Sequence, residues 1–120
     1  CMLHYCSQGH PPALFLRDGK IKELSTDGLA FGVAPFLKNE VSQIKIEPDD
    51  FLLLYTDGVI EAQNSQKEFF GKKRLYDFFL TSRSLSARIC IEDLLKRIET
   101  FSENSPQFDD ITLLALKFFR

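Results

Sequence analysis

The stretch FLLLYTDGVIEA occupies residues 51–62 and joins an apolar run to a polar turn. The run from Phe51 to Tyr55 is unbroken and has the length of a strand. Because successive strand side chains point to opposite faces, an unbroken run indicates an inner strand that is buried on both sides. The run stops at Thr56-Asp57-Gly58, and a short helix is expected over residues 59–63.

Further strand patterns lie on both sides of this stretch. An Asp-Gly turn signal at residues 18–19 predicts a tight hairpin, and Gly28, Gly32 and Pro35 mark a loop. Strands or extended segments are expected at residues 3–6, 13–16, 21–24, 41–46 and 111–118.

Two helices are expected after the central strand. The first covers residues 72–80, and the second covers 87–101 with Ser86 as its N-cap. Its apolar residues recur with helical spacing: Ile91, Leu94, Leu95, Ile98 and Phe101. Because strand hairpins are present without a repeating βαβ pattern, the fold class is α+β with antiparallel sheets.

The composition narrows the class of protein. Hydrophobic residues make up 44% and charged residues 27%, which is typical of a soluble globular domain. Fifteen basic and seventeen acidic residues give a net charge of −2, and they are interspersed. We therefore expect no nucleic-acid partner, since such a surface needs clustered cations. No apolar run approaches the ~18 residues of a membrane span, and no signal peptide is visible, so no membrane contact is expected.

The three cysteines suggest a compartment. Cys1, Cys6 and Cys90 have no metal-ligand spacing and are odd in number, so a reducing, cytoplasmic location is expected. The chain begins with Cys1 rather than Met, and we expect it to be a fragment or a cleaved product.

Three acidic residues stand at predicted strand ends. Asp57 follows the central strand, and Asp109 and Asp110 precede the last one. If these ends converge, the carboxylates offer the oxygen ligands that Mg²⁺ and Mn²⁺ prefer, whereas without a cation they would repel. An ordinary turn and a solvated strand cap would give the same pattern.

Four motifs occur in an order that closely resembles a known family. GHPP lies at residues 9–12, LYTDGVIEA at 54–62, FG at 70–71 and DDITL at 109–113. The combination resembles the SpoIIE/RsbU branch of the PPM (type 2C) metal-dependent protein serine/threonine phosphatases. The resemblance runs over nearly all 120 residues.

The resemblance implies a fold and a chemistry. The fold would be the C-terminal part of a four-layer α-β-β-α sandwich. Asp57 and Asp109 would be catalytic metal ligands in a two-metal centre with Mn²⁺ or Mg²⁺, and Asp110 and Gly58 would support them. The substrate would be a phosphoserine or phosphothreonine protein, often an anti-anti-sigma (STAS-type) factor that controls a sigma factor in a bacterial signalling pathway.

One family motif is missing from this sequence. The family's N-terminal half carries a G-D-x-x-G-H-G-type motif whose Asp bridges both metals, and nothing like it occurs here. We therefore expect residues 1–120 to be the C-terminal portion of one phosphatase domain whose N-terminal half is absent. On its own the chain should be inactive or feebly active, and it should self-associate, for example as a homodimer, through uncovered strands.

Two residues near the motifs keep alternative interpretations. His10 stands at a turn where related phosphatases place an acid associated with an extra metal. Its imidazole would then bind a metal ion or move a proton. In the alternative interpretation, His10 only shapes the loop. Glu61 is a helix-start charge, with a substrate or metal role as the second interpretation.

Two other functions compete with the phosphatase. One is a non-catalytic, phosphatase-like regulatory or phosphoprotein-binding module. The other is an unrelated α+β domain, which predicts that Asp57 and Asp109 lie far apart. No Cys is followed by Arg at the spacing of a thiol phosphatase, which agrees with direct attack by water.

Overall fold

The structure is a computed structural model that describes residues 1–26, 40–103, 105–106 and 109–119. Strands β1 (Met2–Tyr5) and β4 (Ser42–Lys45) pair antiparallel as one small sheet. A four-stranded antiparallel sheet has the order β3-β2-β5-β6. Its strands are β2 (Ala13–Arg17), β3 (Lys20–Leu24), β5 (Phe51–Tyr55) and β6 (Leu113–Lys117).

The expected inner strand is β5. It lies between β2 and β6, with Leu53 opposite Leu14 on one side and Ala115 on the other. Four of its five residues are buried, and Leu54 is half-buried. The prediction of a two-sided buried strand from an unbroken apolar run is therefore confirmed.

The hairpin between β2 and β3 turns at the expected Asp-Gly pair. Asp18 has φ 49° and Gly19 has φ 70°, so both lie in the left-handed region. This backbone matches the twist of two-residue hairpins, and Asp and Gly adopt it at low cost.

The helices follow β5 along the chain. They are α1 (Asp57–Ile60), α2 (Gly71–Thr81), the 3₁₀ helix η1 (Ser82–Ser84) and α3 (Ala87–Ser102). The Ser86 hydroxyl accepts a hydrogen bond of 3.3 Å from the Ile89 amide, which confirms the predicted N-cap. Leu94 and Ile98 are buried as the stripe predicts, but Leu95 is 36% exposed and Cys90 takes a core position instead.

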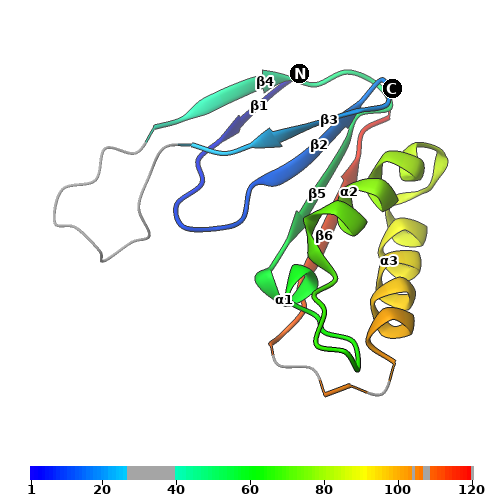
Figure 1. Cartoon of the computed structure of the whole chain (residues 1–120). Helices are drawn as coiled ribbons and strands as arrows, with labels where there is room; N and C mark the ends of the chain where they lie inside the picture. Colours follow the sequence, from blue (N-terminus) through cyan, green and yellow to red (C-terminus); the bar gives the residue numbers. More distant parts are fainter. Residues whose placement is uncertain (27–39, 104, 107–108, 120) are drawn as a thin grey trace, which may run out of the picture.

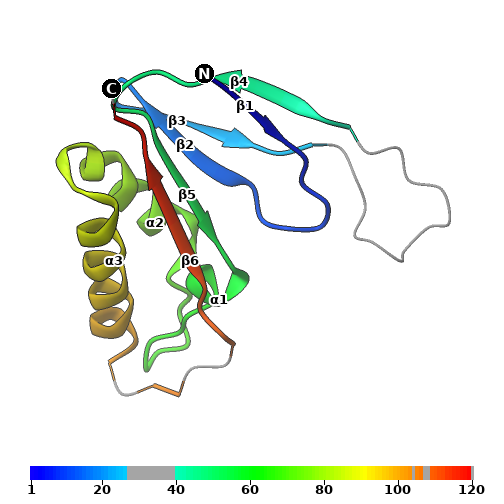
Figure 2. The same cartoon turned by 180° about the vertical axis from the view of Figure 1, so that it is seen from behind.

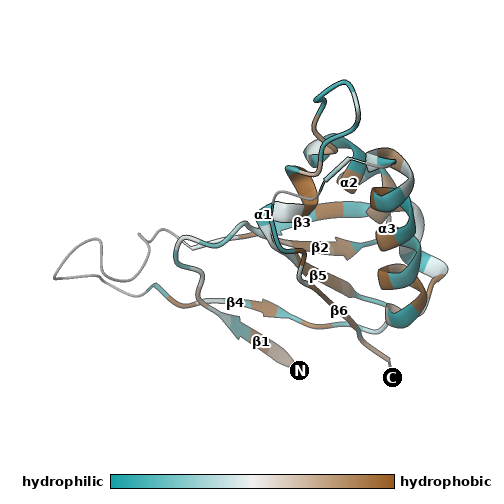
Figure 3. Cartoon of the chain, turned by 90° about the horizontal axis from the view of Figure 1, so that it is seen from below, coloured by the Kyte–Doolittle hydropathy of each residue, from teal (hydrophilic) through white to brown (hydrophobic). Residues whose placement is uncertain are grey.

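The molecule has three layers (Figures 1 and 2). Helices α2 and α3 cover one face of the four-stranded sheet, and the β1–β4 sheet lies on the other side, as Figure 3 shows most clearly. The helix side holds the main core, which includes Leu53, Tyr55, Leu75, Phe79 and Leu94. A smaller apolar cluster around Phe15, Leu24 and Leu52 packs towards β1 and β4.

A buried ion pair ties the turn before β5 to β2. Asp50 is 1% exposed and receives hydrogen bonds from Arg17 Nε at 2.7 Å and Nη2 at 2.5 Å. The Glu47 amide adds a third at 2.7 Å, and Arg17 Nη2 also donates to the Lys45 carbonyl. Burial acts to raise the pKa of Asp50, but these hydrogen bonds and the Arg17 charge outweigh it and lower that pKa. The sequence motif predicted only a turn here.

Some expectations differ from the structure in detail. The short helix begins at Asp57, two residues before the expected start, so Asp57 belongs to its first turn. The last strand is Leu113–Lys117 rather than 111–118. The loop expected around Gly28, Gly32 and Pro35 lies outside the described residues. Within the described part of the chain, every helix is too short or too polar to span a bilayer.

Candidate active site

A cavity of about 280 Å³ opens where β5 ends and β6 begins. Its lining comes from three segments that are distant in the sequence: the Gly-His-Pro turn after β1, the β5–α1 junction, and the segment before β6. Both acidic motifs of the sequence contribute to it. The lining residues are Gly9, His10, Pro11, Thr56, Asp57, Asp109, Asp110 and Thr112.

Thr56 joins the ends of the two strands. Its hydroxyl donates to the Asp110 carbonyl at 3.1 Å and accepts from the Thr112 amide at 2.9 Å. Its own amide donates to the Thr112 carbonyl at 3.1 Å. These three hydrogen bonds fix the β5–α1 junction, which carries Asp57, in position beside the segment that carries Asp110.

Gly58 lets α1 pack directly on the segment before β6. A Cβ at this buried position would lie 2.3 Å from the Asp110 carbonyl oxygen and 3.2 Å from that of Asp109. Real Cβ atoms do not approach backbone that closely, so any side chain would push α1 away. The glycine of the Thr-Asp-Gly motif is therefore required by the close approach of the two acidic segments.

Asp109 and His10 make local hydrogen bonds. Asp109 Oδ1 accepts from the Asp110 amide at 2.8 Å, which orients its carboxylate. His10 Nδ1 lies 2.9 Å from the Pro11 carbonyl oxygen, which can only accept, so Nδ1 is the donor in this contact. This contact agrees with a loop-shaping role for His10, and the ring also lines the cavity.

Tyr55 lies behind the site in the main core. Its side chain is 1% exposed, and its hydroxyl has no hydrogen-bond partner among the described residues. Burial raises the pKa of Tyr55, and the charges of Glu23 and Asp57 raise it further. The phenol thus remains neutral behind the carboxylates at neutral pH.

The structure brings most of the sequence-derived candidates together. Asp57, Asp109, Asp110 and His10 line one cavity, and Gly58 packs against the backbone of Asp109 and Asp110. Glu61 is exposed after α1 and is not part of this lining. Sequence reasoning missed Thr56 and Thr112 as separate contributors. Their signal was present, since Thr56 directly precedes Asp57 and Thr112 follows Asp110 by two residues, each at a strand end.

The donor set suits a hard cation in type but is small in number. The cavity offers carboxylate and carbonyl oxygens, which Mg²⁺ and Mn²⁺ favour. Among the residues that the structure describes, no group of three or more His, Cys, Asp and Glu is arranged to hold a metal ion. The described residues therefore fit a contribution of carboxylate ligands rather than a complete coordination shell.

Comparison with known proteins identifies relatives of the whole chain. Protein IcfG of Synechocystis sp. is 37% identical over 116 residues, which are 95% of this chain and 18% of IcfG. The SiaA-PP2C domain of Pseudomonas aeruginosa shares the fold with a TM-score of 0.79 and 22% identity over 91% of this chain and 44% of that one. The RsbU and RsbW domains of Rv1364c from Mycobacterium tuberculosis match with a TM-score of 0.64 and 26% identity over 95% of this chain and 31% of theirs.

These matches show that the chain has part of a PP2C-like phosphatase fold, with mixed helices and antiparallel sheets. The chain spans less than half the length of each of these relatives. The family described as stage II sporulation protein E (SpoIIE) matches residues 2–119. Because this match covers almost every residue, the chain belongs to the SpoIIE family.

Proposed function

We propose that the protein containing this chain hydrolyses phosphoserine or phosphothreonine in a regulatory protein, with Asp57 and Asp109 as metal ligands. The observation that carries the proposal is the cavity in which both acidic motifs meet at adjacent strand ends. Membership of the SpoIIE family and the PP2C-like fold support it. The geometry also argues against an accidental match of motifs, since that predicts distant acids.

The chain's own residues have distinct tasks in this proposal. Asp57 and Asp109 hold the cation, and Thr56 keeps the β5–α1 junction, which carries Asp57, in a fixed position beside the segment that carries Asp109. Asp110 contributes mainly through its backbone, which Thr56 and Gly58 contact. His10 uses Nδ1 to contact the Pro11 carbonyl, which leaves Nε2 as the ring nitrogen that can transfer a proton at the cavity.

Divalent ions explain why carboxylates gather here. When bound, Mn²⁺ or Mg²⁺ supplies a water of lowered pKa and neutralises charge on the phosphoryl oxygens. The described residues provide too few ligands for tight binding by themselves. We propose that residues 1–120 are the C-terminal portion of one phosphatase domain and that a preceding segment of the protein supplies the remaining ligands.

The proposed substrate is a phosphorylated anti-anti-sigma (STAS-type) protein of a bacterial sigma-factor pathway, as the family resemblance implies. In the Mycobacterium tuberculosis relative, RsbU and RsbW domains occur together in one protein. We propose a cytoplasmic location, which the three free cysteines support. A self-associated state of the isolated chain also remains part of the proposal.

The proposal is tested by removing each ligand charge while keeping side-chain shape. In the longest protein that contains this chain, Asp57→Asn or Asp109→Asn should lower Mn²⁺-dependent phosphate release from a phosphoserine protein at least about a hundredfold. Both acids are exposed, so urea unfolding should change by less than about 1 kcal/mol. The matched control is Asp49→Asn, an exposed acid in the turn before β5, which should retain full activity.

A second measurement separates the enzyme from a non-catalytic module. The incomplete ligand set among the described residues is the observation that favours such a module. Its signature would be binding of the phosphorylated STAS protein without phosphate release, unaffected by Asp57→Asn. Equal phosphate release by the original protein and both ligand variants would refute the assigned roles.

A further inference from the structure

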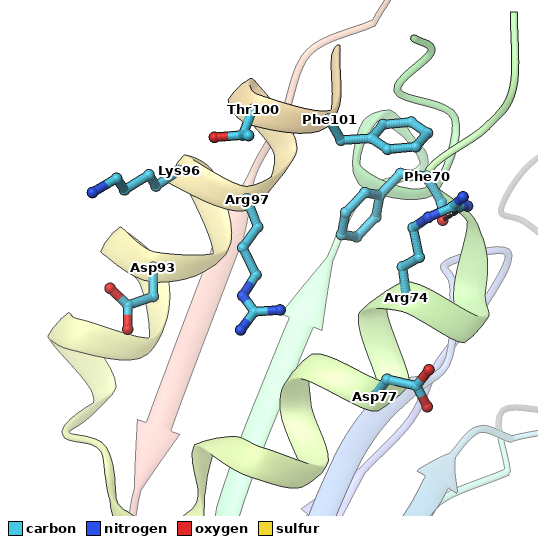
Figure 4. Close-up of a pocket in the computed structure, with 8 residues that line it drawn as sticks. All are labelled: Phe70, Arg74, Asp77, Asp93, Lys96, Arg97, Thr100 and Phe101. Atoms are coloured by element: carbon cyan, nitrogen blue, oxygen red, sulfur yellow. Dashed lines mark hydrogen bonds between the residues drawn. The ribbon is translucent and has the colours of Figure 1, made fainter. Parts of the chain in front are cut away.

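A groove runs between α2 and α3 on the outer face of the helix layer (Figure 4). It encloses about 630 Å³, more than twice the volume of the candidate active site, and the two share no lining residue. The helices run antiparallel along it, since Phe70 contacts Phe101 at one end and Phe78 contacts Arg97 further along. The proposed function makes no use of this surface.

One end of the groove is aromatic. The Phe70 and Phe101 rings meet edge to face, with centroids 5.5 Å apart. The Arg74 guanidinium lies 4.6 Å from the Phe101 centroid and donates to the Phe69 and Phe70 carbonyls at 3.0 and 3.1 Å. Arg74 is therefore held in place, which lowers the entropy that a bound ligand would cost.

The middle of the groove is cationic. Arg97 extends from α3 into the space between the helices, where its guanidinium lies 5.1 Å from the Phe78 centroid. Lys96 lines the outer side of the same turn. In the described part of the chain, neither of these two side chains, nor Arg74, forms an ion pair. Among the described residues, Arg74 and Arg97 thus present two positive charges to the groove without an ion-pair partner, and Lys96 adds a third at its outer edge.

The far end of the groove is acidic. Asp77 on α2 and Asp93 on α3 line it one helical turn beyond Arg74 and Arg97, and their carboxylates point away from each other (Figure 4). Lys73 contacts Asp77 at 2.7 Å and offsets part of its charge. Along the groove the order is therefore aromatic, then positive, then negative.

We propose that this groove binds an acidic segment of a partner protein in one direction. An apolar side chain of that segment would lie against Phe101, carboxylates would meet Arg74 and Arg97, and a basic side chain would reach Asp77. Charge complementarity of this kind sets orientation and specificity more than raw affinity. An open groove between helices suits a peptide segment better than a small ligand, which needs an enclosing pocket.

The proposal is tested with the longest protein that contains this chain and a displayed library of random peptides. Enriched peptides should carry glutamate or aspartate next to an apolar residue, with any lysine on the other side of the acids. A fluorescent copy of such a peptide should bind Arg97→Glu at least about tenfold more weakly, because the change replaces an attraction by a repulsion. The milder variant Arg97→Gln should lose less.

Two matched measurements sharpen the result. Lys45→Glu, a charge reversal at an exposed position on β4, should leave peptide binding unchanged. A peptide in which the acids are replaced by lysines should bind Arg97→Glu better than it binds the original protein. A peptide with the residue order inverted should bind weakly, since in the same chain direction it places its lysine at the aromatic end beside Phe101 and its apolar residue beside Asp77.

Several outcomes would overturn the proposal. A library that yields no peptide, or peptides that bind Arg97→Glu and the original protein equally, contradicts it. A single-stranded oligonucleotide that outcompetes the acidic peptide would assign the cations to nucleic acid instead. A change in oligomeric mass caused by Arg97→Glu would make the groove a contact between copies of the protein.

Discussion

The two faces of the four-stranded sheet differ although they are built from the same strands. On the helix side, Leu53 is fully buried with Tyr55 beneath α2 and α3. On the opposite side, Leu114 is 50% exposed and Leu116 is 42% exposed, although they lie beside the β5 residues Leu54 and Leu52. The side chains on the helix side of the sheet therefore pack in a closed core, whereas the side chains on the opposite side are only partly covered.

The difference shows which part of the fold the chain completes by itself. The two-stranded β1–β4 sheet covers Phe15 and Leu52 but leaves the β6 end of the face open. Apolar side chains half exposed on an edge strand are an association surface unless another segment covers them. The candidate active site lies at the strand ends, at the border between the two faces.

The strongest test compares one leucine from each face. In the isolated chain, Leu53→Ala should cost about 3 kcal/mol of unfolding free energy, because it leaves a cavity in a closed core. Leu114→Ala should cost less than about 1 kcal/mol, since half of the side chain already contacts water. Urea unfolding of both variants measures the difference.

The same pair tests whether a further segment covers the open face. In the longest protein that contains this chain, Leu114→Ala should become nearly as costly as Leu53→Ala. An unchanged small cost there would show that the face stays open and would contradict the proposed domain organisation.

The next effect concerns the ion pair at the turn before β5. Asp50→Asn should lower the unfolding free energy by about 2 kcal/mol. This loss is smaller than the loss expected when one partner of a fully buried ion pair is removed, because the Arg17 side chain is 31% exposed. Asp49→Asn is the matched control, since the neighbouring Asp49 is exposed and Asn tolerates its positive φ. Equal stability of the two variants would show that the pair contributes nothing.

The ion pair also gives a pH dependence with a definite sign. The folded-state pKa of Asp50 is lowered below the ordinary 3.8, so its contribution is complete above that pH and is lost as the pH falls through the folded value. Asp50→Asn should therefore flatten the acidic limb of the stability curve. The loss of stability in the variant should shrink below about pH 4.

How much the sequence predicted depends on the range of the interactions. Local patterns were sufficient for β5, the Asp18-Gly19 hairpin and the Ser86 cap, because each is decided within a few residues. The Arg17–Asp50 pair joins residues 33 positions apart, and no local pattern distinguishes Asp50 from its exposed neighbour Asp49. Leu95 was misjudged because helical spacing predicts a stripe but not the width of the surface that covers it.

For the candidate site, too, the sequence predicted what depends on local patterns and missed what depends on distant contacts. The acids stood out because they follow or precede apolar strands, and the family resemblance supplied their roles. Thr56 and Gly58 act through contacts with a segment more than 50 residues away, 54 positions in the case of Thr56 and Asp110. Such contacts require the strand order, which the sequence alone did not provide.

A smaller effect concerns association through the open face. The isolated chain should self-associate, and Leu114→Lys together with Leu116→Lys should shift it towards the monomer, because charged residues on an edge strand oppose pairing. The matched control is Leu80→Lys on α2, which is 39% exposed on the helix side. Light scattering measures the mass. Equal shifts in all variants would remove the distinction between the two faces.

The smallest expected effect lies in the closed core. Tyr55→Phe removes a buried hydroxyl that has no hydrogen-bond partner among the described residues. Because burial without a partner costs free energy, the variant should be as stable as the original or more stable, by up to about 1 kcal/mol. Tyr76→Phe, which removes an exposed hydroxyl that donates to Glu23, is the control and should change little. A loss of about 2 kcal/mol for Tyr55→Phe would mean that the hydroxyl has a partner in a segment beyond the described residues, and that the helix-side core is not complete by itself.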